Sequence, residues 1–189
     1  MQDLINHWRT LEYHDPGQIL RRLRALEIEL AGVQIDATVG RLRTNELKKY
    51  REWRDAALFT YGMGLAQDSS IRYATEEDSD YDFVATWDLE GRRHFCPVQL
   101  KELVPADLNP AATLDGLLRK LRPAPAPSYT VLAVRLNRAG HLDLKSLALP
   151  KIPFAQLWFF WASAPNGTRW SLFGDALGTP GQVEFDYPQ

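Results

Sequence analysis

The chain has 189 residues, 45% of them hydrophobic and 24% charged, which is typical of a globular protein with a sizeable core. Its formal net charge of −2 counts against an overall basic surface for nucleic acid, although it allows a local basic groove. The one cysteine, Cys96, excludes an internal disulfide and a cysteine-rich zinc site and fits a reducing compartment, so we expect a cytoplasmic protein. No apolar run approaches the ~18 residues of a membrane span, and we expect no signal peptide and no membrane contact.

Two amphipathic helices are predicted in an N-terminal helical segment, residues 1–43, which we expect to pack on a core domain of residues 44–189. Residues 1–14 carry an apolar stripe at helical spacing. Asp15 then has the position of an N-cap, with Pro16 at the first helical position and Gln18 placed to close a capping box. The second helix is expected to end near Gly32. Its arginines indicate either a solvated surface or an arm that contacts phosphate.

A third helix is predicted over residues 44–66, followed by a strand at residues 71–75. Apolar residues recur in this helix at steps of three and four, which predicts a buried face made of Leu47, Tyr50, Trp53, Ala57, Tyr61 and Leu65. Glu46 lies at the border of that face, where a first-turn glutamate can also simply complement the helix dipole. The acidic stretch after the strand, residues 76–82, is expected to form mostly a solvated loop.

Residues 79–101 predict a β-hairpin that ends in a chemically distinctive triplet. Two runs rich in β-branched and aromatic residues flank a polar turn that contains Gly91. Residues two apart in a strand share a face, so Gln99 and Lys101 should point the same way. The spacing can bring Asp82, at the start of the first strand, beside them at one end of the sheet. Taken singly, Asp82 is more often a turn acid and Lys101 a charged edge residue.

The second half of the chain predicts a helix, a buried strand and a terminal hairpin. Asn109 and Pro110 have the pattern of an N-cap and a first-turn proline, for a helix ending near Arg122. The apolar run at residues 129–136 is typical of a central strand reached by a right-handed parallel crossover. A short helix is predicted at residues 142–149. Two aromatic-rich strands, residues 154–161 and 168–173, flank an Asn-Gly turn and extend the sheet as a hairpin. Their aromatic side chains could stack on bases, but such a run more often belongs to a core or an interface.

This pattern resembles the PD-(D/E)XK nucleases, the restriction-endonuclease-like superfamily. The matching residues are Asp82 and, on the next strand, Gln99-Leu100-Lys101. Tyr81 stands where the motif has proline, and Gln99 stands where it has an acid, as in Mrr-like restriction proteins. The order of elements over residues 44–136 is helix, three strands, helix, strand, which is also the core order of that superfamily. The resemblance therefore implies an α/β (α+β, mixed-sheet) fold with N-terminal helices and a C-terminal hairpin added.

The resemblance also implies a metal-dependent hydrolysis of nucleic acid, most simply as a DNA endonuclease. Asp82, Gln99 and the carbonyl of Leu100 would hold Mg²⁺ or Mn²⁺, and Lys101 would hold the attacking water and contact the phosphate. Glu46 would add a carboxylate from the preceding helix, and Glu77 or Asp80 could join it. Replacing an acid with Gln99 removes one negative charge and should weaken metal binding. The alternatives are a catalytically inactive relative that binds nucleic acid or a protein partner, and an unrelated α/β interaction domain; a homodimer is compatible with each.

Overall fold

The computed structural model describes residues 2–30, 48–76, 80–121, 129–138, 143–144 and 147–189. The helices and strands in these ranges, in chain order, are α1 (Gln2–Trp8), α2 (Pro16–Leu30), α4 (Lys48–Ala66), β1 (Arg72–Thr75), β2 (Phe83–Leu89), β3 (Arg92–Leu103), α5 (Leu114–Lys120), β4 (Val131–Leu136), β5 (Gln156–Ala162), β6 (Arg169–Gly174) and β7 (Gly181–Asp186). Within these residues, no helix combines the length and the apolar character that crossing a membrane requires.

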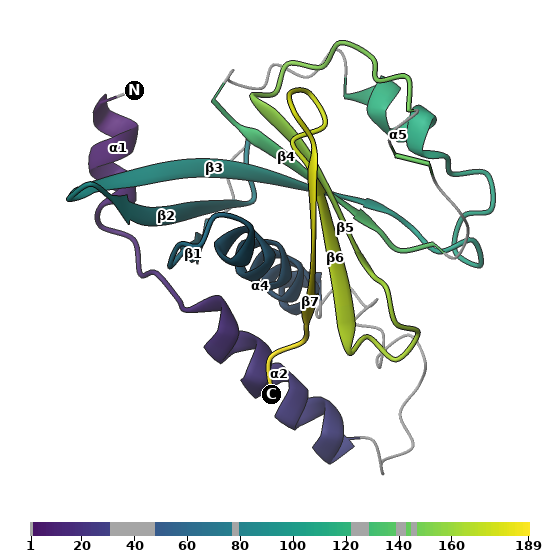
Figure 1. Cartoon of the computed structure of the whole chain (residues 1–189), viewed down its shortest axis with the longest axis horizontal. Helices are drawn as coiled ribbons and strands as arrows, with labels where there is room; N and C mark the ends of the chain where they lie inside the picture. The colour runs from purple at the N-terminus through teal and green to yellow at the C-terminus, as the bar shows by residue number, and fades with distance from the viewer. Residues whose placement is uncertain (1, 31–47, 77–79, 122–128, 139–142, 145–146) are drawn as a thin grey trace.

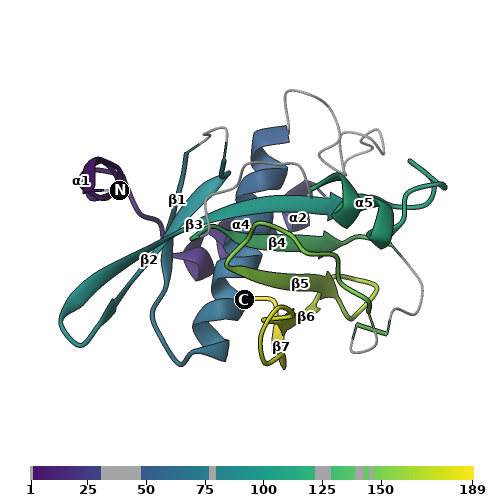
Figure 2. The ribbon, with the colours of Figure 1, turned by 90° about the horizontal axis from the view of Figure 1, so that it is seen from above.

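All seven strands form one mixed sheet in which spatial order equals chain order, from β1 to β7. The first three strands are antiparallel, β3, β4 and β5 run parallel, and β5, β6 and β7 are antiparallel again. Figure 1 and Figure 2 show the strong twist of this sheet, with the β2–β3 hairpin reaching out beside α1. The predicted mixed α/β class is thus confirmed, and α5 connects the parallel strands β3 and β4 as expected.

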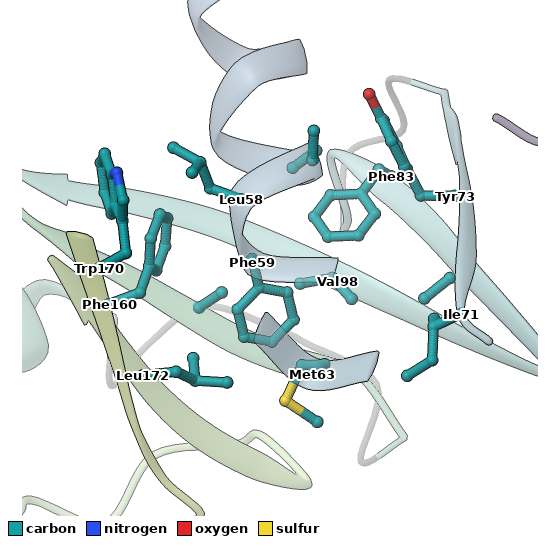
Figure 3. Packing of buried hydrophobic residues seen from close by; sticks show 14 of the residues in the cluster. Leu58, Phe59, Met63, Ile71, Tyr73, Phe83, Val98, Phe160, Trp170 and Leu172 are labelled. Carbon is teal, nitrogen blue, oxygen red and sulfur yellow. The ribbon is translucent and has the colours of Figure 1, made fainter. Parts of the chain in front are cut away.

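The main core lies between α4 and one face of the sheet (Figure 3). Phe59 and Met63 of α4 pack there against Phe83 of β2, Val98 of β3 and Phe160 of β5. Residues 55–60 are all buried, because α4 lies between the sheet and α2. A helix covered on two sides needs no single apolar stripe.

The buried face predicted for α4 is therefore wrong in part. Tyr50, Trp53 and Leu65 are 40%, 38% and 49% exposed, although their spacing suggested burial. Ala57, from the same set, is fully buried. The contact with the sheet runs instead through Phe59 and Met63, so the buried surface is rotated away from the aromatic stripe. Leu47 lies outside the described residues.

The opposite face of the sheet carries two smaller apolar clusters. One lies under α5 and joins Leu114 and Leu118 to Leu103, Leu132 and Val134 of the sheet. The other lies under α1. It centres on three buried residues, Trp8, Tyr81 and Val84. Between the two clusters lies the point where β2 begins. Beyond this point β3 no longer pairs with β2 and pairs with β4 instead.

The helix predicted to begin at Asn109-Pro110 begins later, at Leu114. Thr113 is its N-cap, and the Thr113 hydroxyl accepts a hydrogen bond from the Gly116 amide at 3.0 Å. Asn109 instead uses its side-chain oxygen to accept from the Ala111 amide within a turn. The guanidinium of Arg138 donates to the carbonyls of Asn109 and Ala112, so a residue distant in sequence stabilises that turn.

Two further differences concern the C-terminal part. Residues 147–150 are not helical, although a helix was predicted over 142–149; Leu144, Leu147 and Leu149 pack on the α5 cluster without one. The predicted hairpin is confirmed as β5 and β6. A seventh strand, β7, extends it and was not foreseen.

Both N-terminal helices are present within the described residues, although α1 ends at Trp8 and the stripe over residues 1–14 suggested a longer helix. The cap of α2 is the predicted one. The Gln18 amide donates to Asp15 Oδ1 at 2.8 Å, so one unpaired donor of the first turn is satisfied. We expect Asp15→Ala to lower the free energy of unfolding by about 1 kcal/mol. Urea denaturation measures this against Glu12→Ala, an exposed acid outside the helix. Equal stability of the two variants would contradict a capping role.

Candidate functional site

Asp82 lies at the entrance of β2, where its backbone and its side chain both bind β3. Its amide donates to the Val98 carbonyl at 2.9 Å, one residue out of register with the ladder, which pairs Val98 with Phe83. Its carboxylate oxygen Oδ2 accepts from the Leu100 amide at 2.6 Å. A charge-assisted bond of this length fixes the carboxylate at the middle residue of the Gln99-Leu100-Lys101 triplet. Asp82 thus reaches the triplet at the Leu100 backbone, while its predicted approach to the Gln99 and Lys101 side chains stays a prediction.

Gln99 and Lys101 leave β3 on the face of the sheet opposite α4. Val98 belongs to the core beneath α4, and side chains alternate along a strand, so Gln99 and Lys101 point to the other side. In the parallel ladder Gln99 lies opposite Leu132 and Lys101 opposite Val134, both members of the α5 cluster. Both side chains are half-buried. They thus occupy the surface between the α1 and α5 clusters.

Two oxygen atoms of the triplet, the Gln99 side-chain oxygen and the Leu100 carbonyl, are the further candidates for metal ligands. Backbone groups of alternate residues in a strand point to the same neighbour. Since Val98 bonds to Asp82 through its carbonyl, Leu100 also turns its backbone toward Asp82, as its amide bond confirms. Gln99 Oε1 is buried and, among the described residues, has no hydrogen-bond partner. A buried oxygen without a donor is costly unless a ligand or ion satisfies it.

The α1 cluster supports this site through a contact that the sequence pattern did not indicate. The indole Nε1 of Trp8 donates to the hydroxyl of Tyr81 at 3.1 Å, and the two rings meet edge to face. Tyr81 directly precedes Asp82, so α1 fixes the backbone from which the carboxylate extends. Tyr13 donates to the Trp8 carbonyl at 3.0 Å and completes the support. A bond that spans 73 residues leaves no local signal in the sequence.

The structure describes only some of the other acidic residues considered for the site. Glu46 and Glu77 lie outside the described residues. Asp80 is described and half-buried two positions before Asp82. Glu76 pairs with His7 of α1 and so belongs to the α1 contact. Within the described ranges, no three histidine, cysteine or acidic side chains gather as a metal cluster.

The candidate ligands are therefore one carboxylate, one amide oxygen and one backbone carbonyl, and Lys101 leaves β3 on the same face as Gln99. These are hard oxygen ligands of the kind that Mg²⁺ and Mn²⁺ prefer, and Mg²⁺ commonly keeps several waters beside one or two carboxylates. The residues thus fit a hydrated divalent cation with few protein ligands.

Comparisons with protein-family models, with curated proteins and with solved structures give no match to this chain.

Proposed function

We propose that this protein is a metal-dependent nuclease that hydrolyses phosphodiester bonds, with DNA as substrate. In this proposal Asp82, Gln99 and the Leu100 carbonyl hold Mg²⁺ or Mn²⁺, and Lys101 acts on the attacking water and the phosphate. The observation that carries it is the convergence at one sheet position. The Asp82 carboxylate accepts from the Leu100 amide, Gln99 Oε1 has no hydrogen-bond partner among the described residues, and Lys101 lies on the same face as Gln99.

The arrangement of the strands supports the same proposal. From α4 to β4 the chain forms a helix, an antiparallel run of three strands, a crossover helix and a parallel fourth strand. The helices α4 and α5 pack on opposite faces. This is the arrangement expected of a restriction-endonuclease-like core, with the triplet on its third strand. The C-terminal strands and the N-terminal helices would be additions to that core.

In this proposal the cation would carry most of the chemistry, and the side chains hold the cation and stabilise charge. A bound divalent cation would polarise the phosphate and make a bound water more acidic. Asp82 orients that site, because its carboxylate is fixed by the Leu100 amide. Gln99 contributes an uncharged oxygen, so the protein supplies less negative charge than a site with two acids. Lys101 places a compact positive charge where negative charge grows on the phosphate.

Incubation with supercoiled plasmid and Mn²⁺ tests the proposal. We expect nicked and linear products that disappear when EDTA removes the metal. Salt-sensitive retention of DNA without any cleavage would favour the inactive nucleic-acid-binding relative instead. If the protein neither cleaves nor retains DNA, both proposals are refuted.

Exchanging Gln99 for glutamate tests the metal site at its most unusual position. The added carboxylate should tighten metal binding, so the Mg²⁺ concentration for half-maximal cleavage should fall roughly tenfold. Titration of cleavage against Mg²⁺ measures the change. Gln99→Leu is the matched control, since it keeps the size and removes the oxygen, and it should need more Mg²⁺ than the wild type. An identical Mg²⁺ dependence in all three proteins would mean that Gln99 is no ligand.

A further inference from the structure

A cavity of about 340 Å³ lies on the α4 side of the sheet, away from the Gln99 and Lys101 side chains. It exists because β3 extends beyond its neighbour: pairing with β4 begins only at Val98 and Val131, so residues 92–97 pair with β2 alone. The C-terminal half of α4 covers the space left open there. Met63, Val98 and Ile71, which surround one part of it, are labelled in Figure 3.

The wall of this cavity carries no charged side chain among the described residues. It is formed mainly by aromatic and aliphatic groups, among them Phe59, Met63 and Trp87. Cys96 also lines it, and burial raises the pKa of this thiol to about 12, so it stays neutral at physiological pH. A charged ligand would lose its hydration here without gaining a partner.

One polar group in the wall is unsatisfied. Thr60 of α4 is 1% exposed, and its hydroxyl oxygen has no hydrogen-bond partner within the described parts of the chain. Gln156, at the start of β5, lines the same space and is engaged with the Trp158 indole at 3.0 Å. An apolar space with few polar groups is the usual form of a small-molecule site.

We propose that this cavity binds an uncharged, mainly apolar small molecule that offers one hydrogen-bonding group to Thr60. The size suits two or three fused or linked rings, since an engineered apolar cavity of about 150 Å³ already accepts benzene. The site shares β3 with the proposed nuclease centre but uses the other face of the strand. Its occupation therefore does not depend on phosphodiester hydrolysis.

Titration of the full chain with N-phenyl-1-naphthylamine, an uncharged three-ring fluorophore with one N–H, tests the proposal. We expect a saturable rise in emission with one probe per chain. Its sulfonated analogue, 8-anilinonaphthalene-1-sulfonate, has the same ring frame plus a negative charge and should bind at least about tenfold more weakly. Equal affinity for both probes, or no saturable emission, would overturn the proposal.

Two variants locate the probe. Ala155 is exposed at the wall of the cavity, so Ala155→Trp should obstruct it and weaken binding at least about tenfold without disturbing the core. Ala162→Trp places the same side chain at an exposed alanine at the other end of β5 and should leave binding unchanged. Thermal unfolding followed by circular dichroism checks that both variants fold. Equal effects of the two substitutions, or none from Ala155→Trp, would show that the probe binds elsewhere.

Discussion

Lys101→Ala is expected to lower the rate of Mn²⁺-dependent plasmid cleavage by roughly 10²–10³-fold, the usual cost of removing one group that stabilises charge in a transition state. Lys101 is half-buried on β3 and lies one residue from the amide that holds Asp82. Truncation removes the positive charge while the backbone bond between Leu100 and Asp82 stays. The loss should therefore appear in the rate of the chemical step. The measurement is single-turnover cleavage at saturating Mn²⁺.

Lys120→Ala is the matched control, because Lys120 is an exposed lysine in the last turn of α5. It should cleave within about twofold of the wild type, since a solvated surface charge is strongly screened. Lys101→Arg keeps the charge with a different shape and should recover part of the lost rate. Full activity of Lys101→Ala would remove the lysine from the mechanism.

Asp55→Ala is expected to lower the free energy of unfolding by about 3–5 kcal/mol, the cost of removing one partner of a buried ion pair. Asp55 Oδ1 lies 2.6 Å from Arg135 Nη1, and the two side chains are only 9% and 11% exposed. A second cation, Arg54, lies 3.9 Å from the same oxygen. Burial, and next the charge of Arg135, lowers the pKa of Arg54, whereas Asp55 raises it. Without Asp55, the buried Arg135 guanidinium loses the carboxylate 2.6 Å away, and Arg54 loses one of two nearby carboxylates, the other being Glu27 at 3.8 Å.

Chemical denaturation of matched variants separates the buried pair from a surface one. Asp186 pairs with Arg169 at 3.2 Å, but these side chains are 77% and 57% exposed. Asp186→Ala should therefore cost at most about 1 kcal/mol. The double variant Asp55→Leu with Arg135→Met removes both charges and should regain much of the stability lost by Asp55→Ala. A loss at Asp55 no larger than that at Asp186 would contradict this account of the core.

Local patterns predict much of this fold because the relevant interactions are local. Asp15 caps α2 through a bond that spans three residues. The Asn166-Gly167 turn joins β5 and β6, and Gly167 has a φ of 68°, which glycine adopts without strain. The approach of Asp82 to Leu100 follows from strand geometry, since a hairpin of fixed register brings its two ends together.

The parts that were missed depend on contacts between distant segments. β7 has polar, exposed side chains at alternate positions and buries Phe185 against α4, so its apolar content is too low to indicate a strand. The turn that keeps Asn109 and Pro110 outside α5 is bound by Arg138, which follows it by more than 25 residues. The support of Asp82 by Trp8 depends on a helix that precedes it by more than seventy residues.

The most direct test of the central claim is an anomalous diffraction experiment on crystals soaked in MnCl₂. The account predicts a manganese peak bound by the Asp82 carboxylate, Gln99 Oε1 and the Leu100 carbonyl, at metal–oxygen distances of roughly 2.1 Å. An ordered site without manganese, at a concentration that supports plasmid cleavage, would contradict it. So would manganese bound only at other residues.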